Sequence, residues 1–178
     1  MTTATTNRQS IPVGAYTLDP VHSTFGFAVK HNGVSMFRAQ FEQVDATLED
    51  GTLTGTARVD SVKTALPQLK EHLLSPDFFN AADNPDITFR STDIRLGQDG
   101  RAEVTGDLTI RGVTRPVTAD GTYGAAISPL GSEVVGFDLE ATVDRRDYGL
   151  NWQAPLPSGG NAVAWEVRLE AQLELAKA

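Results

Sequence analysis

From Tyr16 to the C-terminus, apolar residues recur at every second position, and this period of two restricts the fold more than any other feature. In the last such segment, Val163, Trp165 and Val167 begin a row that continues to Leu175, with polar or charged residues between its members. This alternation is typical of strands with one buried and one solvated face. Short turn sequences such as residues 50–52 separate the segments, so successive strands are expected to be antiparallel.

About eight strands follow from this pattern. They are expected over residues 16–31, 37–48, 53–61, 87–97, 102–110, 113–123, 135–143 and 163–175. A change of parity after Phe41 predicts a bulge near Gln43. Long strands in an open sheet would expose their edges, so the sequence favours closure into a barrel. The predicted fold is therefore all-β, an eight-stranded antiparallel barrel.

One helical insertion interrupts the strands. Leu66, Leu69 and Leu73 fall at helical spacing, and Thr64 is positioned to cap the helix that contains them. A second short turn of helix is expected to begin at Ser75, with Pro76 in the first helical position. Both pieces are the size of a lid or a plug.

Composition and charge exclude several classes of partner. The 178 residues suit one domain, expected over residues 15–178, after a polar and flexible N-terminal arm over residues 1–14. A formal charge of -8 disfavours nucleic acid and anionic membrane surfaces. The chain has no cysteine, so it has no disulfide and no thiolate ligand. With neither a signal-peptide core nor a long apolar run, it is expected to be cytoplasmic, without membrane insertion.

Small residues in the inward rows leave two interpretations of the barrel interior. Gly55, Ala57, Gly106, Ala141 and Ala171 either accommodate the taper of a filled barrel or leave room for a ligand. His31 is similarly ambiguous. It continues the row of Phe25 and Phe27, where its imidazole could bond a backbone carbonyl or touch a bound ligand.

Several segments in register resemble the YceI-like family. They are LDPVHSTFGFAVKH (18–31), SVKT (61–64), HLLSPDFFN (72–80), NPDITFRS (84–91), GDLTIRGVTRPV (106–117) and DRRDYGLNW (144–152). The resemblance implies a lipocalin-like barrel that carries a polyisoprenoid or similar long-chain amphiphile, with no other cofactor, and a possible homodimer. Many members are exported. Where the family often has Arg-Asp before the His-Leu of the helix and a basic residue just after it, this chain has Lys70, Glu71 and Leu74. If those basic positions hold a charged head group, the difference implies a less charged ligand.

Aromatic side chains form the main candidate binding site. A prenyl chain among such rings gains about 0.8 kcal/mol for each methylene removed from water, although each ring could instead pack as core. Arginine suits a phosphate or carboxylate head group, and an Arg–Asp surface pair is the plainer alternative for Arg146. The predicted ligand-binding residues are Phe25, Phe27, His31, Phe41, Phe78, Phe79, Phe89, Phe137, Arg146, Trp152 and Trp165.

Catalysis and metal binding are the competing hypotheses. Asp19, Asp147 and Glu166 are scattered, and no nucleophile elbow or phosphate-binding loop occurs, so a carboxylate or histidine enzyme acting on a hydrophobic substrate is the second choice. His22 and His31 lie nine positions apart, on opposite faces of a regular strand, so no metal site is expected. In the segment DPVHS, Asp19 and Ser23 are expected to accept hydrogen bonds from the backbone.

Overall fold

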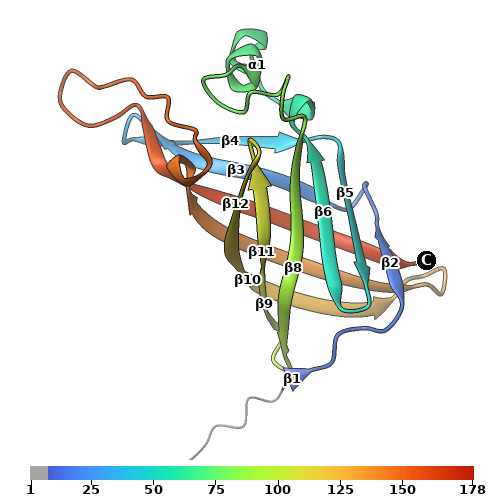
Figure 1. Cartoon of the computed structure of the whole chain (residues 1–178). Coiled ribbons are helices and arrows are strands. Elements are labelled where there is room, and N and C mark those ends of the chain that lie inside the picture. Colours follow the sequence, from blue (N-terminus) through green and yellow to red (C-terminus); the bar gives the residue numbers. More distant parts are fainter. Residues whose placement is uncertain (1–7) are drawn as a thin grey trace, which may run out of the picture.

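The computed structural model describes residues 8–178, which form an antiparallel barrel with one α-helix at one end (Figure 1). The strands are β1 (Arg8–Gln9), β2 (Ala15–Leu18), β3 (Thr24–His31), β4 (Ser35–Phe41), β5 (Val44–Glu49), β6 (Thr52–Arg58), β7 (Val62–Lys63), β8 (Asp86–Gly97), β9 (Arg101–Ile110), β10 (Val113–Ile127), β11 (Glu133–Asp144) and β12 (Val163–Lys177). The helices are α1 (Pro67–Leu74) and the 3-10 helices η1 (Val59–Ser61) and η2 (Arg145–Tyr148).

The barrel closes through the pairing of β11 with β12. Around the ring the order is β11, β10, β9, β8, β6, β5, β2 and β12, and each neighbouring pair is antiparallel. Toward α1, β12 pairs with β3 instead of β2, and β4 and β7 continue that part of the wall. The predicted eight-stranded antiparallel barrel is confirmed.

Two expected strands are each divided in two, and a third ends early. Residues 19–23 separate β2 from β3, and the strand expected over residues 53–61 ends at Arg58, where η1 begins. The expected bulge near Gln43 is a two-residue break between β4 and β5, where the backbone amides of Glu42 and Gln43 bond the carbonyl and the hydroxyl of Ser61. These breaks let single strands bend from one part of the wall into the next.

The helix begins later than the sequence predicted. Thr64 does not cap it: the first helical residue is Pro67, and Thr64 donates its hydroxyl to the Leu66 carbonyl. A residue before proline is driven to extended angles, and Leu66 has φ -126° and ψ 133°. The expected second turn of helix at Ser75 and Pro76 is also wrong, because that segment forms hydrogen-bonded turns.

Buried side chains form two clusters at the two ends of the barrel. The cluster beneath α1 includes Phe27, Phe41, Leu73, Phe79 and Tyr148. The opposite cluster includes Tyr16, Leu48, Leu96, Phe137 and Leu175, and all five are at most 2% exposed. The end of the barrel away from α1 is therefore packed with side chains.

The N-terminal arm expected over residues 1–14 lies partly outside the described residues. Within the described part, Arg8 and Gln9 form β1, which pairs with Gly97 and Leu96 of β8. Among residues 8–178, no helix has the length and apolar character needed to cross a bilayer.

Candidate functional site

A cavity of about 490 Å³ lies in the half of the barrel beneath α1. Alternate residues of β3 form one wall, and α1, the turns after it and η2 form the cover. A smaller cavity of about 110 Å³ lies between the two core clusters and shares Phe25, Ile87 and Leu169 with the larger one. Its lining includes Gly55, Ala57, Ala141 and Ala171, so four of the five small inward residues border open space.

Gly106, the fifth small residue, serves a different purpose. A Cβ atom there would lie 2.5 Å from the Phe89 ring and 2.4 Å from the Arg90 carbonyl oxygen. Such distances are too short for any side chain to fit. Gly106 therefore lets the Phe89 ring pack flat against β9, where Phe89 borders the smaller cavity.

Arg111 holds the cover in place. It lies in the turn between β9 and β10, and one guanidinium nitrogen donates to the carbonyls of Pro76 and Phe78. Arg111 and Gly112 have left-handed φ of 51° and 73°, and glycine adopts such an angle without strain. The Phe78 ring in turn packs 5.3 Å from Trp152, and His72 lies 4.9 Å from each of them. These contacts join α1 to the segment after η2.

Arg145 is the buried charge of the site. It is 5% exposed and lines the larger cavity. Its guanidinium donates to the carbonyl oxygens of Ala164, Leu150, Trp152 and Val163 at 2.6 to 3.2 Å. Burial lowers the pKa of Arg145, with an opposing effect from Asp144. The side chain therefore fastens the loop between η2 and β12 to the barrel.

Tyr148 lines the same cavity and is 1% exposed. Its hydroxyl is buried and has no hydrogen-bond partner among residues 8–178. Burial raises the pKa of Tyr148 to about 12, with a smaller contribution from Asp147. Sequence reasoning missed this residue, although it lies within the DRRDYG segment that drew attention to Arg146.

The structure places most of the predicted site residues on the walls of the larger cavity. These are Phe25, Phe27, His31, Phe41, Phe78, Phe79 and Trp152. His31 lies at the exposed end of β3, and its imidazole makes no hydrogen bond within the described chain, which leaves the expected carbonyl bond unformed. Contact between these side chains and a ligand stays a prediction.

The other predicted residues lie elsewhere. Phe137 packs 5.2 Å from Tyr123 in the cluster at the far end of the barrel. Arg146 is exposed and paired with Asp144, the plainer alternative for such a side chain. Trp165 is not on the wall because β12 is irregular between Val163 and Val167, which breaks the alternation on which its inward position depended.

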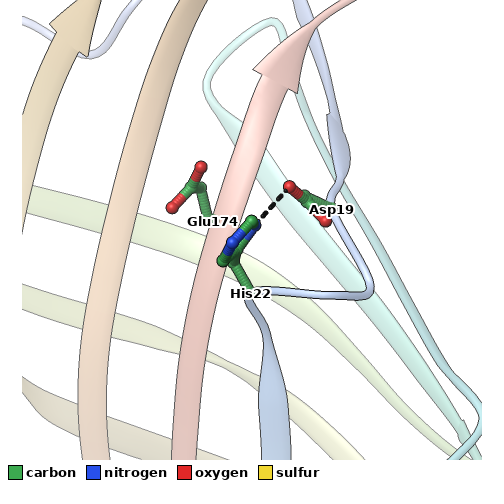
Figure 2. Close-up of side chains that lie close together, drawn as sticks. All are labelled: Asp19, His22 and Glu174. Atoms are coloured by element: carbon green, nitrogen blue, oxygen red, sulfur yellow. Dashed lines mark hydrogen bonds and ion pairs between the residues drawn. The ribbon is translucent and has the colours of Figure 1, made fainter. Parts of the chain in front are cut away.

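The three histidines occupy three different parts of the structure, at residues 19–23, at the end of β3 and in α1. The His22 ring forms a hydrogen bond of 2.8 Å with Asp19, and Glu174 of β12 lies beside them (Figure 2). One imidazole nitrogen and one oxygen from each carboxylate lie within 4.8 Å of one another. This hydrogen bond from His22 lowers the pKa of Asp19, and the same bond raises the pKa of His22. The Val21 amide donates to Asp19 and the Glu174 amide donates to Ser23, as the sequence predicted. These hydrogen bonds fasten the turn over residues 19–23 to β12.

The fold and the cavity define a class: a lipocalin-like antiparallel β-barrel that encloses an apolar cavity under a helical cover. Residues 16–175 match the family model described as the YceI-like domain, and the chain belongs to this family. It is 34% identical to a UPF0312 protein of Staphylococcus epidermidis over 169 residues, which covers 89% of this chain and 95% of the relative. A UPF0312 protein of Staphylococcus aureus is 33% identical over 168 residues, with the same coverage.

Two solved structures share the fold. Burkholderia cenocepacia BcnA superposes with a TM-score of 0.70 at 20% identity, covering 88% of this chain and 98% of BcnA. A polyisoprenoid binding domain from Saccharophagus degradans superposes with a TM-score of 0.68 at 15% identity, covering 92% and 98%. Both likenesses support the barrel architecture predicted from the alternating pattern.

Proposed function

We propose that this protein binds a polyisoprenoid or another long-chain amphiphile inside the barrel and sequesters or carries it. The observation that carries the proposal is the cavity of about 490 Å³ under the helical cover, lined mainly by aromatic and aliphatic side chains. Cavities of this size and character bind small apolar ligands. The polyisoprenoid binding domain of Saccharophagus degradans has the same fold and supports the same conclusion.

Binding without catalysis fits the chemistry of the cavity wall. Its titratable residues are His31, His72, Arg145 and Tyr148, and within residues 8–178 no aspartate or glutamate lines it. The carboxylate-dependent enzyme considered as the alternative would need such a group beside the substrate. A ligand in this cavity would be held by burial of its chain.

The test is extraction of purified protein with organic solvent, followed by mass spectrometry of the extract. The expected result is a hydrophobic molecule in about equimolar amount. The control is Phe27→Arg, which places a guanidinium at a cavity-wall position that is 9% exposed and should lose that molecule. An extract without any such molecule, from protein that also fails to take up geranylgeraniol from vesicles, would refute the proposal.

A further inference from the structure

The turn between β2 and β3 meets β12 at the point where β12 changes its strand partner. β12 pairs with β2 near its end and with β3 along its middle, and residues 173–174 pair with neither strand. The turn over residues 19–23 bonds β12 there instead. The Asp19 amide donates to the Glu174 carbonyl at 2.8 Å, and the Ser23 hydroxyl bonds both the amide and the carbonyl of Glu174. These backbone bonds hold the two segments in a fixed relation.

Three side chains from this junction point toward one another (Figure 2). One imidazole nitrogen of His22 and one carboxylate oxygen from each of Asp19 and Glu174 lie within 4.8 Å of one another. Asp19 and Glu174 are half-buried and His22 is exposed, so solvent reaches the group from one side. Leu173 lines the smaller cavity, and because side chains alternate along a strand, Glu174 lies on the outer face of the barrel. The group is therefore separate from both cavities.

The Glu174 carboxylate is the unexplained member of the group. Within residues 8–178 this carboxylate forms no hydrogen bond and no ion pair, whereas the His22 ring and Asp19 bond each other at 2.8 Å. Glu174 fastens the turn through its backbone, which a residue of any type would do. Its side chain adds a second negative charge beside Asp19, on a chain whose formal charge is already -8. Like charges at this distance repel, and a bound cation would offset the repulsion.

The three donor atoms indicate which kind of cation fits. Imidazole nitrogen suits zinc and neighbouring transition metals, whereas magnesium and calcium prefer oxygen ligands throughout. Zinc bonds of about 2.0–2.2 Å place ligand atoms about 3.3 Å apart around a tetrahedral ion. Rotation of the exposed His22 side chain lets the group contract to this spacing. Zinc would then replace the proton in the hydrogen bond between His22 and Asp19, and a water molecule would complete four ligands.

We propose that Asp19, His22 and Glu174 form a binding site for a divalent transition-metal ion such as zinc on the outer face of the barrel. The sequence argued against a metal held by His22 and His31 together. The fold instead supplies His22 with two carboxylates, one from its own turn and one from the last strand. The ion joins the turn to β12 through side chains, in addition to the backbone hydrogen bonds, and its binding requires no ligand in the barrel.

The test is calorimetric titration of the full chain, without a histidine tag and stripped of metal by a chelator, with zinc. The expected result is about one zinc ion per chain. His22→Gln and Glu174→Gln should each weaken zinc binding by about tenfold or more, because loss of a residue that merely orients a metal ligand already costs about 10- to 100-fold. Glu174→Gln is the sharper variant, since its carboxylate has no bond to lose in the metal-free chain.

Two further variants serve as matched controls. His31 is an exposed histidine at the end of β3, and Glu166 is an exposed glutamate in the same strand as Glu174. His31→Gln and Glu166→Gln should both bind zinc as the wild type does. Because a ligand that binds only the folded state stabilises it, saturating zinc should raise the melting temperature of the wild type and of both controls. The increase should be much smaller in Glu174→Gln.

Four results would overturn the inference. The wild-type protein could show no saturable zinc binding. Glu174→Gln could bind zinc as tightly as the wild type, which would leave a surface histidine that takes up zinc without a built site. His31→Gln could lose as much affinity as His22→Gln, which would place the zinc elsewhere. Magnesium could bind as tightly as zinc, which would indicate general attraction to negative charge. The proposed function is tested separately, by the hydrophobic extract, and stands or falls without regard to these outcomes.

Discussion

The guanidinium of Arg145 lies over the Trp165 ring, with its central carbon 4.3 Å from the ring centroid. The guanidinium of Arg146 lies 4.8 Å from the same ring. Both guanidinium groups thus form cation–π contacts with Trp165, in which the quadrupole of the ring attracts the positive charges. The Trp165 ring therefore packs against the two arginines and does not line the cavity.

Substitution of the two adjacent arginines should have very different effects. Arg145→Met removes four hydrogen bonds to buried or half-buried carbonyls and should lower the free energy of unfolding by about 3–5 kcal/mol. Arg146→Met removes an exposed pair with Asp144 and should lower the free energy of unfolding far less. Urea denaturation of both variants measures the difference, and equal losses would contradict the role given to Arg145.

Arg111 should control how firmly the cover is held. Arg111→Ala removes the bonds to the carbonyls of Pro76 and Phe78, so the turns after α1 should open more often. We expect faster amide hydrogen exchange over residues 75–80 and ligand release accelerated about 3- to 10-fold. Arg115→Ala, at an exposed arginine of the following strand, is the control and should leave both rates near wild type. Unchanged exchange in Arg111→Ala would contradict the role of Arg111 in holding the cover.

Leu169 should limit the length of chain that the barrel accepts, because it borders both cavities. Leu169→Trp adds volume at their junction and should weaken binding of geranylgeraniol by about tenfold or more, while geraniol is affected less. Leu169→Met conserves volume and should bind both alcohols as the wild type does. The measurement is competition for a fluorescent fatty-acid probe. An equal loss for the two alcohols would show that the cavities do not form a continuous path.

The Asp19–His22 pair should make stability depend on pH. Asp19 raises the pKa of His22 above 6.5, so its contribution is complete below the unfolded pKa and is lost as pH rises through the raised value. The pKa of Asp19 is lowered below 3.8, so that contribution is lost as pH falls through the lowered value. Asp19→Asn should therefore reduce the melting temperature more at about pH 5.5 than at about pH 9.

Two measurements check this prediction. An NMR titration of the His22 ring should show its pKa falling toward the ordinary value in Asp19→Asn. In a His22→Gln background, Asp19→Asn should have the same effect on the melting temperature at both pH values. A pH dependence that survives in that background would assign it to other groups.

The alternation of apolar residues was sufficient to predict the barrel, because in a strand the side-chain direction follows from position alone. It also placed seven of the predicted residues on the cavity wall, among them Phe25, Phe27 and His31 on the inward face of β3. Trp165 shows where such reasoning ends. The irregularity in β12 depends on how that strand meets β3, which a single sequence does not reveal.

Sequence patterns did not predict the direction of a side chain where tertiary contacts determine it. Arg145 and Arg146 are identical in type and adjacent, yet η2 turns one inward and the other outward. Phe137 has the same parity as cavity residues but lies on the part of β11 that belongs to the far cluster. Tyr148 could have been noticed as a polar-tipped aromatic between charged residues and a glycine. The absence of a partner for its hydroxyl is visible only once the packing is known.

The packing of Leu48, Leu96 and Leu175 closes the end of the barrel away from α1, and this has a consequence for ligand entry and release. A barrel that is filled with side chains at one end is open only at the other, so a ligand must leave by the route through which it entered. For the amphiphile proposed above, we expect the apolar chain to enter first and the head group to stay near the α1 end. Transfer of a ligand to an acceptor would require the α1 end of the barrel to face that acceptor. A bound ligand would also have to be released before a second one could bind.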